Sequence, residues 1–156
     1  MTAEADLEIV FDPTEAGANV VRAHLDAFNF AATGVATWYP VNLLVKNGRG
    51  EILGGVIAIA WGGWLGISLL WVDEALRGQG WATRLMDRAE AIGRERGCHS
   101  ACLDTHSFQA RPFYEKRGYE VFGTLDDYPA GHRKFFLRKK LEGHNRLDLP
   151  DATRSD

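Results

Sequence analysis

Residues 70–83 read LWVDEALRGQGWAT: an apolar strand end, a loop with two glycines, and the start of a long amphipathic pattern. Glycines let the backbone approach a ligand closely, and the first turn of a helix leaves backbone N–H groups without partners. The helix dipole also favours an anion at this end. The pattern predicts a phosphate or pyrophosphate site at the loop 77–82, with Arg77 adding charge or capping the loop. A purely structural glycine turn is the alternative.

The loop lacks residues that two common types of phosphate-binding loop require. A nucleotide P-loop needs Gly-Lys-Ser/Thr, which is absent here. A dinucleotide fingerprint needs a third small residue where Thr83 stands, although Asp104 at a later strand end keeps that alternative open. Such a loop normally follows the first strand of a parallel βαβ series. This loop instead follows two apolar runs separated by Gly62-Gly63, which predicts an antiparallel hairpin because a primed turn needs positive φ.

The remaining elements are predicted from hydrophobic period and turn residues. Before the loop we expect strands at 7–11, 41–45, 51–61 and 64–72, a helix at 18–30, and a loop or short helix at 31–40. After it we expect helices at 81–96 and 109–117, and strands at 100–105, 119–123 and 132–140. The order β-α-βββ-α-β-α-ββ predicts an α/β (α+β) fold with a mixed central sheet and helices on both faces. One domain is expected over residues 1–141, followed by a polar tail over 142–156.

Composition excludes several function classes. The chain has 156 residues and a net charge of −3, which argues against a nucleic-acid partner. The N-terminus has no signal-peptide pattern, and the apolar stretch 54–72 is broken by glycines, so we expect a cytoplasmic protein with no membrane partner.

The two cysteines do not form a recognisable metal motif. Cys98 and Cys102, with His99 and His106 nearby, fit no common zinc spacing. Two free thiols and no metal are expected.

Two segments resemble the signatures of one known family. The segment Arg77-Gly78-Gln79-Gly80-Trp81-Ala82 resembles the acetyl-CoA signature Gln/Arg-x-x-Gly-x-Gly/Ala of the GNAT family of N-acetyltransferases. The segment ARPFYEKRGY, residues 110–119, resembles the family's second signature, Ala-x-x-x-Tyr-x-x-x-Gly-Phe/Tyr. The two occur in the family's order and at a similar separation, and the predicted element order fits the GNAT fold.

The resemblance implies transfer of an acetyl group from acetyl-CoA to a primary amine, by direct attack in a ternary complex. It implies that the strand end at residues 70–72 holds the pantetheine arm, that an N–H near Val72 polarises the thioester carbonyl, and that Tyr114 protonates the leaving thiolate. Ser107 stands where the family often has Asn. The cofactor-binding residues implied are Leu70, Trp71, Val72, Arg77, Gly78, Gln79, Gly80, Trp81, Ala82, Thr83, Ser107, Phe113 and Tyr114.

The sequence leaves several candidates for the general base and for the residues that bind the acceptor. The candidate bases are Asp73, Glu74, Asp104, His106 and His132, with Glu74 named as the catalytic residue and a buried water chain as the alternative. The predicted walls of the acceptor pocket are Trp38, Tyr39, Tyr128 and His132, and Asp126 and Asp127 are candidates to attract a cationic amine or to form a polar turn.

A small-molecule amine is the expected acceptor, a peptide amine stays open, and the resemblance implies a homodimer. The competing function is a non-catalytic acyl-CoA binding or sensing module on the same fold.

Overall fold

The computed structural model describes residues 7–35 and 38–141. These residues fall into two compact units, which divide between positions 36 and 37. In the first unit, helix α1 spans Glu15–Thr33. It ends because Gly34 adopts the left-handed conformation (φ 69°) and donates its N–H to the Phe30 carbonyl. The helix predicted at 18–30 is confirmed, and it extends to Thr33, into the segment expected to be a loop or short helix.

The strand predicted at residues 7–11 is wrong, because these residues have no strand conformation. Ile9 and Phe11 are exposed. An apolar run becomes a strand only where a neighbouring strand pairs with its backbone groups, and five residues say nothing about a partner. In the described part of the chain, the sheet begins at Tyr39.

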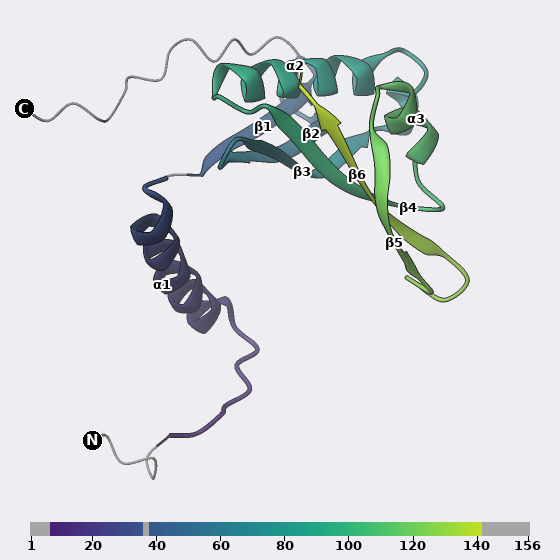
Figure 1. Ribbon diagram of the computed structural model, residues 1–156. Helices are drawn as coiled ribbons and strands as arrows, with labels where there is room; N and C mark the ends of the chain where they lie inside the picture. Colours follow the sequence, from purple (N-terminus) through teal and green to yellow (C-terminus); the bar gives the residue numbers. More distant parts are fainter. Residues whose placement is uncertain (1–6, 36–37, 142–156) are drawn as a thin grey trace, which may run out of the picture. The chain divides into compact units, whose positions relative to one another are not determined.

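The second unit contains a six-stranded sheet. Its strands lie in the spatial order β1-β2-β3-β4-β6-β5 (Figure 1). Strands β3 and β4 pair in parallel, and the other neighbouring pairs are antiparallel, so the predicted mixed sheet is confirmed. The strands are β1 Tyr39–Lys46, β2 Ile52–Trp61, β3 Trp64–Val72, β4 Ser100–His106, β5 Glu120–Asp126 and β6 Arg133–Lys140.

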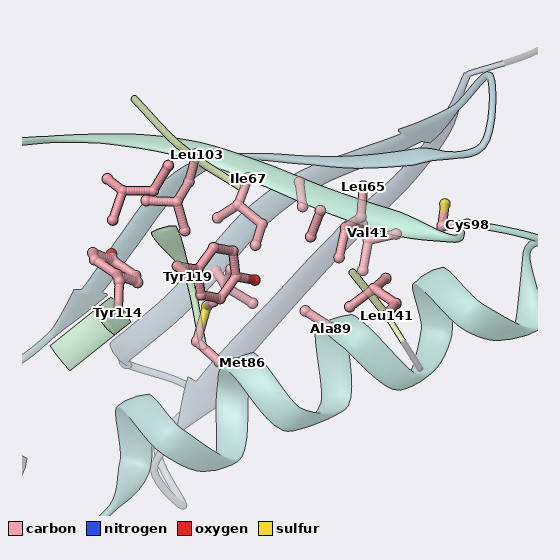
Figure 2. Close-up of a cluster of buried hydrophobic side chains, with 14 of the residues drawn as sticks. Val41, Leu65, Ile67, Met86, Ala89, Cys98, Leu103, Tyr114, Tyr119 and Leu141 are labelled. Carbon is pink, nitrogen blue, oxygen red and sulfur yellow. The ribbon is translucent and has the colours of Figure 1, made fainter. Parts of the chain in front are cut away.

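The helices of this unit cover one face of the sheet. Helix α2 spans Trp81–Glu95, α3 spans Arg111–Lys116, and a short 3-10 helix, η2, spans Glu74–Leu76. Figure 2 shows Met86 and Ala89 of α2 pointing toward the sheet, in a cluster that also holds Leu65 of β3 and Tyr114. The predicted amphipathic helix after the glycine loop therefore forms the core with the sheet. Helices on the second face stay a prediction.

The sheet is split at its centre. Strand β3 carries an extra residue, Ser68, in its pairing with β2, and the Ser68 hydroxyl donates to the Ile57 carbonyl over 3.0 Å. Pairing between β3 and β4 covers only Trp64–Ile67 and Ser100–Leu103. A bulge bends a strand and increases its local twist. The second halves of β3 and β4 are therefore left unpaired with each other, and their backbone edges are available to a ligand.

Candidate active site

The opening between the unpaired strand ends holds a cavity of about 670 Å³. Residues 67–72 of β3 and 103–106 of β4 form two of its walls, and Phe113 and Tyr114 of α3 form a third. The apolar strand end and the second signature segment, both selected from the sequence, thus meet at one site.

The edge of β3 presents backbone groups to this cavity. Asp73 donates its N–H to the Leu53 carbonyl over 2.8 Å, toward β2. Because backbone groups of successive strand residues point to opposite sides, the N–H groups of Val72 and Leu70 point away from β2. The Val72 carbonyl accepts a 3.2 Å hydrogen bond from Arg77 Nε, as expected for a group on that open side. Two N–H groups of β3 therefore face the gap between the strands.

The glycine loop continues this cavity. A second cavity of about 320 Å³ lies over the loop and over residues 80–83 at the start of α2, and it shares Val72, Arg77, Ala82 and Phe113 with the first. Gly78 and Gly80 have positive φ (72° and 81°), and a Cβ at either would meet nothing within 4 Å. No side chain caps the N-terminus of α2. The two cavities form one trough from a helix N-terminus to the split in the sheet.

Three side chains hold the loop in shape. Arg77 donates to the Val72 carbonyl and so caps the loop, which is one of the two roles that the sequence predicted for it. Gln79 Nε2 donates to the Ala75 carbonyl over 3.0 Å, and Asp73 Oδ1 accepts the Ala75 N–H over 2.9 Å. Neither Gln79 nor Glu74 lines the trough; Glu74 is exposed on η2.

Tyr114 is buried at the side of the trough, with 7% of its surface exposed. Burial raises the pKa of the Tyr114 phenol, and the negative charge of Asp104 raises it further. Asp104 also lines the cavity, where Lys134 Nζ lies 3.2 Å from its Oδ1. Tyr114 therefore keeps its proton at neutral pH.

Aromatic residues close the far end of the cavity. His106 and Phe108 line it, and their rings stack with centroids 5.2 Å apart. The Tyr128 ring stacks on His106 at 5.5 Å, and His132 meets Phe108 edge-on at 5.0 Å. Tyr128 and His132, predicted as acceptor walls, thus contact residues that line the cavity but do not line it themselves.

Ser107 links the loop after β4 to the start of β6. Its hydroxyl accepts the Arg133 N–H over 3.1 Å and lies 3.3 Å from His132 Nδ1. It does not line the trough. The neighbouring acidic pair belongs to a turn, because Asp126 binds Arg133 (3.0 Å) and Asp127 Oδ1 accepts the Gly131 N–H (3.3 Å).

The other two predicted acceptor residues are not brought to the cavity. Tyr39 pairs with Ala60, which pairs with Leu65, so it lies at the opposite end of the strands from Val72. Its ring lies 3.4 Å from the guanidinium of Arg96. Trp38 directly precedes Tyr39, is exposed, and lines neither part of the trough.

The lining residues that the sequence did not single out include Phe108 and Gln109. Gln109 Oε1 accepts the His106 backbone N–H over 2.8 Å and lies 3.2 Å from both Thr105 Oγ1 and His106 Nδ1. It fits no motif by itself; only its place one residue before the second signature marks it.

The cysteines have no redox or metal arrangement in the described ranges. Cys98 and Cys102 are free, and burial raises the pKa of both thiols, which makes them poor nucleophiles. Within residues 7–35 and 38–141, no group of three or more His, Cys, Asp or Glu side chains is placed to hold a metal ion. None of the described helices has the length and apolarity to cross a membrane.

Comparison with known proteins agrees with this geometry. Residues 14–119 match the model of the Acetyltransferase (GNAT) family. Acetyltransferase Atu2258 of Agrobacterium fabrum is 35% identical over 121 residues, 78% of this chain and 88% of that protein. Blasticidin-S acetyltransferase of Streptomyces morookaense is 43% identical over 94 residues, 60% of this chain and 69% of that protein.

A crystal structure of an acetyltransferase from Bacillus cereus superposes with a TM-score of 0.73 at 33% identity, covering 85% of this chain and 97% of that one. With the split sheet, the glycine loop and the buried tyrosine, these matches show that the chain belongs to the GNAT family of acetyltransferases.

Proposed function

We propose that this protein transfers the acetyl group of acetyl-CoA to the primary amine of a small molecule, by direct attack in a ternary complex. The observation that carries the proposal is the continuous trough, which joins an uncapped helix N-terminus to an open strand edge beside a buried phenol.

The two ends of the trough match the two chemical ends of acetyl-CoA. Its diphosphate needs N–H donors and a positive dipole, which residues 81–83 at the start of α2 provide. Its pantetheine amides need a strand-like partner, which the free edge of β3 at Leu70 and Val72 provides. The bound thioester would supply the acyl group and a thiolate leaving group.

Two groups of the chain are assigned to the reaction. The Val72 N–H would stabilise negative charge on the carbonyl oxygen, as fixed donors do in other acyl transfers. Tyr114 would give its proton to the departing sulfur, since burial keeps the phenol protonated. The predicted roles of Gln79 and Ser107 at the coenzyme, and of Glu74 as base, stay predictions.

A small molecule is the acceptor best supported. The relative at 43% identity is named for acetylation of blasticidin S. The far end of the cavity offers aromatic walls at His106 and Phe108, with Asp104 beside them to attract a cation. The cytoplasmic location, the homodimer and the absence of a nucleic-acid partner stay predictions.

Two measurements test the proposal. Coenzyme A at 100 times its Kd should stabilise the fold by about 2.7 kcal/mol, whereas NAD should not. A thiol-release assay with acetyl-CoA and a panel of small amines and peptides then identifies the acceptor. Stabilisation by coenzyme A without thiol release for any amine would favour the sensing module. Absence of stabilisation would refute both functions.

A further inference from the structure

One hydrogen-bond arrangement at the far end of the cavity indicates which ring nitrogen of His106 carries the hydrogen in the neutral form. Gln109 Oε1 lies 2.8 Å from the backbone nitrogen of His106. A backbone N–H can only donate, so the side-chain atom that faces it must be the amide oxygen and not the amide nitrogen. The orientation of the Gln109 amide is thereby determined.

The same oxygen lies 3.2 Å from His106 Nδ1. A carbonyl oxygen can only accept, so Nδ1 must carry the hydrogen. A neutral imidazole has one N–H, which leaves Nε2 with a free lone pair. Thr105, which is 3% exposed, directs its hydroxyl to the same oxygen over 3.2 Å and helps to hold it in place.

The ring of His106 is held on its other sides as well. It stacks with Phe108 and with Tyr128 at centroid distances of 5.2 and 5.5 Å, with interplanar angles of 19° and 26°. The Nδ1 edge is bound to Gln109, and the ring lines the cavity that also contains Tyr114 and Asp104. Within the described residues, Nε2 makes no hydrogen bond, so it is the ring nitrogen left for a ligand.

On these grounds, and resting on the proposed function, we propose that His106 Nε2 is the proton acceptor for the amine substrate and that Gln109 is its positioning residue. In this step an N–H bond of the substrate ammonium breaks, its electron pair stays on nitrogen as the attacking lone pair, and the proton forms a bond to Nε2. His106 then releases that proton to solvent. Glu74, exposed on η2, lines neither part of the trough.

The charges around His106 come from several elements. Asp104 lies on the same strand, and Lys134 of β6, which pairs with His106 in the sheet, is bound to Asp104. Tyr128 stacks on the ring, Tyr114 lines the same cavity, and His132 contacts Phe108. Asp104 is the competing base in this group, so the test must separate it from His106.

The first experiment needs no catalysis. A long-range ¹⁵N–¹H NMR spectrum of the histidine rings, with His106 assigned by its loss in His106→Asn, should show Nδ1 protonated and Nε2 free. Gln109→Leu should return the ring to a mixture of the two forms. Protonation at Nε2 in the wild-type protein would overturn the inference even if the enzyme is active, and the spectrum is informative even if no amine is acetylated.

The second experiment is the pH profile of kcat/KM with one amine, so that the amine's own titration is common to all variants. His106→Asn should lower kcat about 10²-fold or more and remove the acid limb that histidine causes, with acetyl-CoA binding unchanged. Gln109→Glu keeps the accepting oxygen and adds a negative charge, so it should move that limb to higher pH.

The matched control is His99→Asn, because His99 is exposed and directly precedes Ser100, at the end of β4 opposite to His106. Its profile should equal the wild-type profile. If Asp104→Asn or Glu74→Gln removes the limb while His106→Asn retains it, the base is another group and the inference fails.

Discussion

The charge of Asp104 raises the pKa of Tyr114, and both residues line the same cavity. A raised pKa makes a phenol a weaker acid, which at first argues against proton donation to a thiolate of ordinary pKa, about 8.5. The same burial, however, raises the pKa of a thiol released into this cavity. Donor and acceptor therefore remain close in proton affinity, which is the condition for efficient transfer.

Tyr114→Phe tests the proton donor. The substitution keeps the aromatic packing against Phe113 and Tyr119 and removes only the hydroxyl. We expect kcat to fall about 10²-fold or more, because general acid catalysis contributes that much, while the Kd for acetyl-CoA from calorimetry stays unchanged. An unchanged kcat would show that the sulfur obtains its proton elsewhere.

Asp104→Asn tests the electrostatic coupling. Removal of the negative charge should lower the pKa of Tyr114 toward its usual value, because the charge of Asp104 is one of the two causes that raise it. The alkaline limb of kcat, where Tyr114 loses its proton, should accordingly move to lower pH. Ultraviolet titration of Asp104→Asn against Asp104→Asn/Tyr114→Phe isolates this tyrosine, and an unmoved limb would contradict the coupling.

Gly80 and Gly97 allow a matched test of the phosphate end. They flank the two ends of α2 with nearly equal φ (81° and 83°), and an added Cβ would meet nothing within 4 Å at either position. Alanine at each should therefore cost the same conformational strain, about 1–2 kcal/mol, in urea unfolding. Calorimetry should show weaker coenzyme A binding for Gly80→Ala alone. Equal loss of affinity in both variants would place the diphosphate elsewhere.

Local sequence patterns predicted most of the fold. The strand predicted at 64–72 from the Gly62-Gly63 turn and the apolar run after it has the limits observed for β3. The prediction succeeded because both glycines have positive φ (58° and 82°), as a primed hairpin turn requires. The prediction of a strand at 7–11 was wrong, because a strand forms only where another strand, distant in sequence, pairs with it. The 3-10 helix at Glu74–Leu76 was not expected, because its single turn carries no hydrophobic period.

The parts of the site that lie in sequence motifs were predicted. The parts that depend on which strands pair in the sheet were not. The two signatures located the loop and Tyr114. Tyr39 was misplaced relative to the cavity because strand order, which puts it at the far end of the sheet from Val72, cannot be read from local pattern. Gln109 was missed because its importance comes from three contacts of one oxygen, which only coordinates reveal.

Tyr119→Phe tests the buried polar network behind the site. Glu90 is 3% exposed; its Oε1 accepts the Tyr119 hydroxyl over 2.9 Å, and its Oε2 lies 2.9 Å from Lys139 Nζ. Loss of that hydroxyl removes one hydrogen bond to Glu90 Oε1, although Arg117 Nη2 still lies 3.3 Å from that oxygen, so urea unfolding at pH 8 should show a loss of about 1–3 kcal/mol. Arg138→Ala, which breaks the exposed pair with Glu120 (54% and 68% exposed), should cost at most about 1 kcal/mol.

The difference in free energy of unfolding between the wild-type protein and Tyr119→Phe should decrease at high pH. Burial, the first cause, and Glu90 raise the pKa of Tyr119 in the folded protein above the ordinary value of 10. Above about pH 10 the unfolded chain therefore loses the Tyr119 proton first, and the wild-type free energy of unfolding falls as pH rises. Tyr119→Phe lacks this contribution, so the gap between the two proteins should narrow from pH 10 upward. A gap that stays constant to pH 11, or a cost at pH 8 no larger than that of Arg138→Ala, would show that the Glu90 network does not depend on the Tyr119 proton.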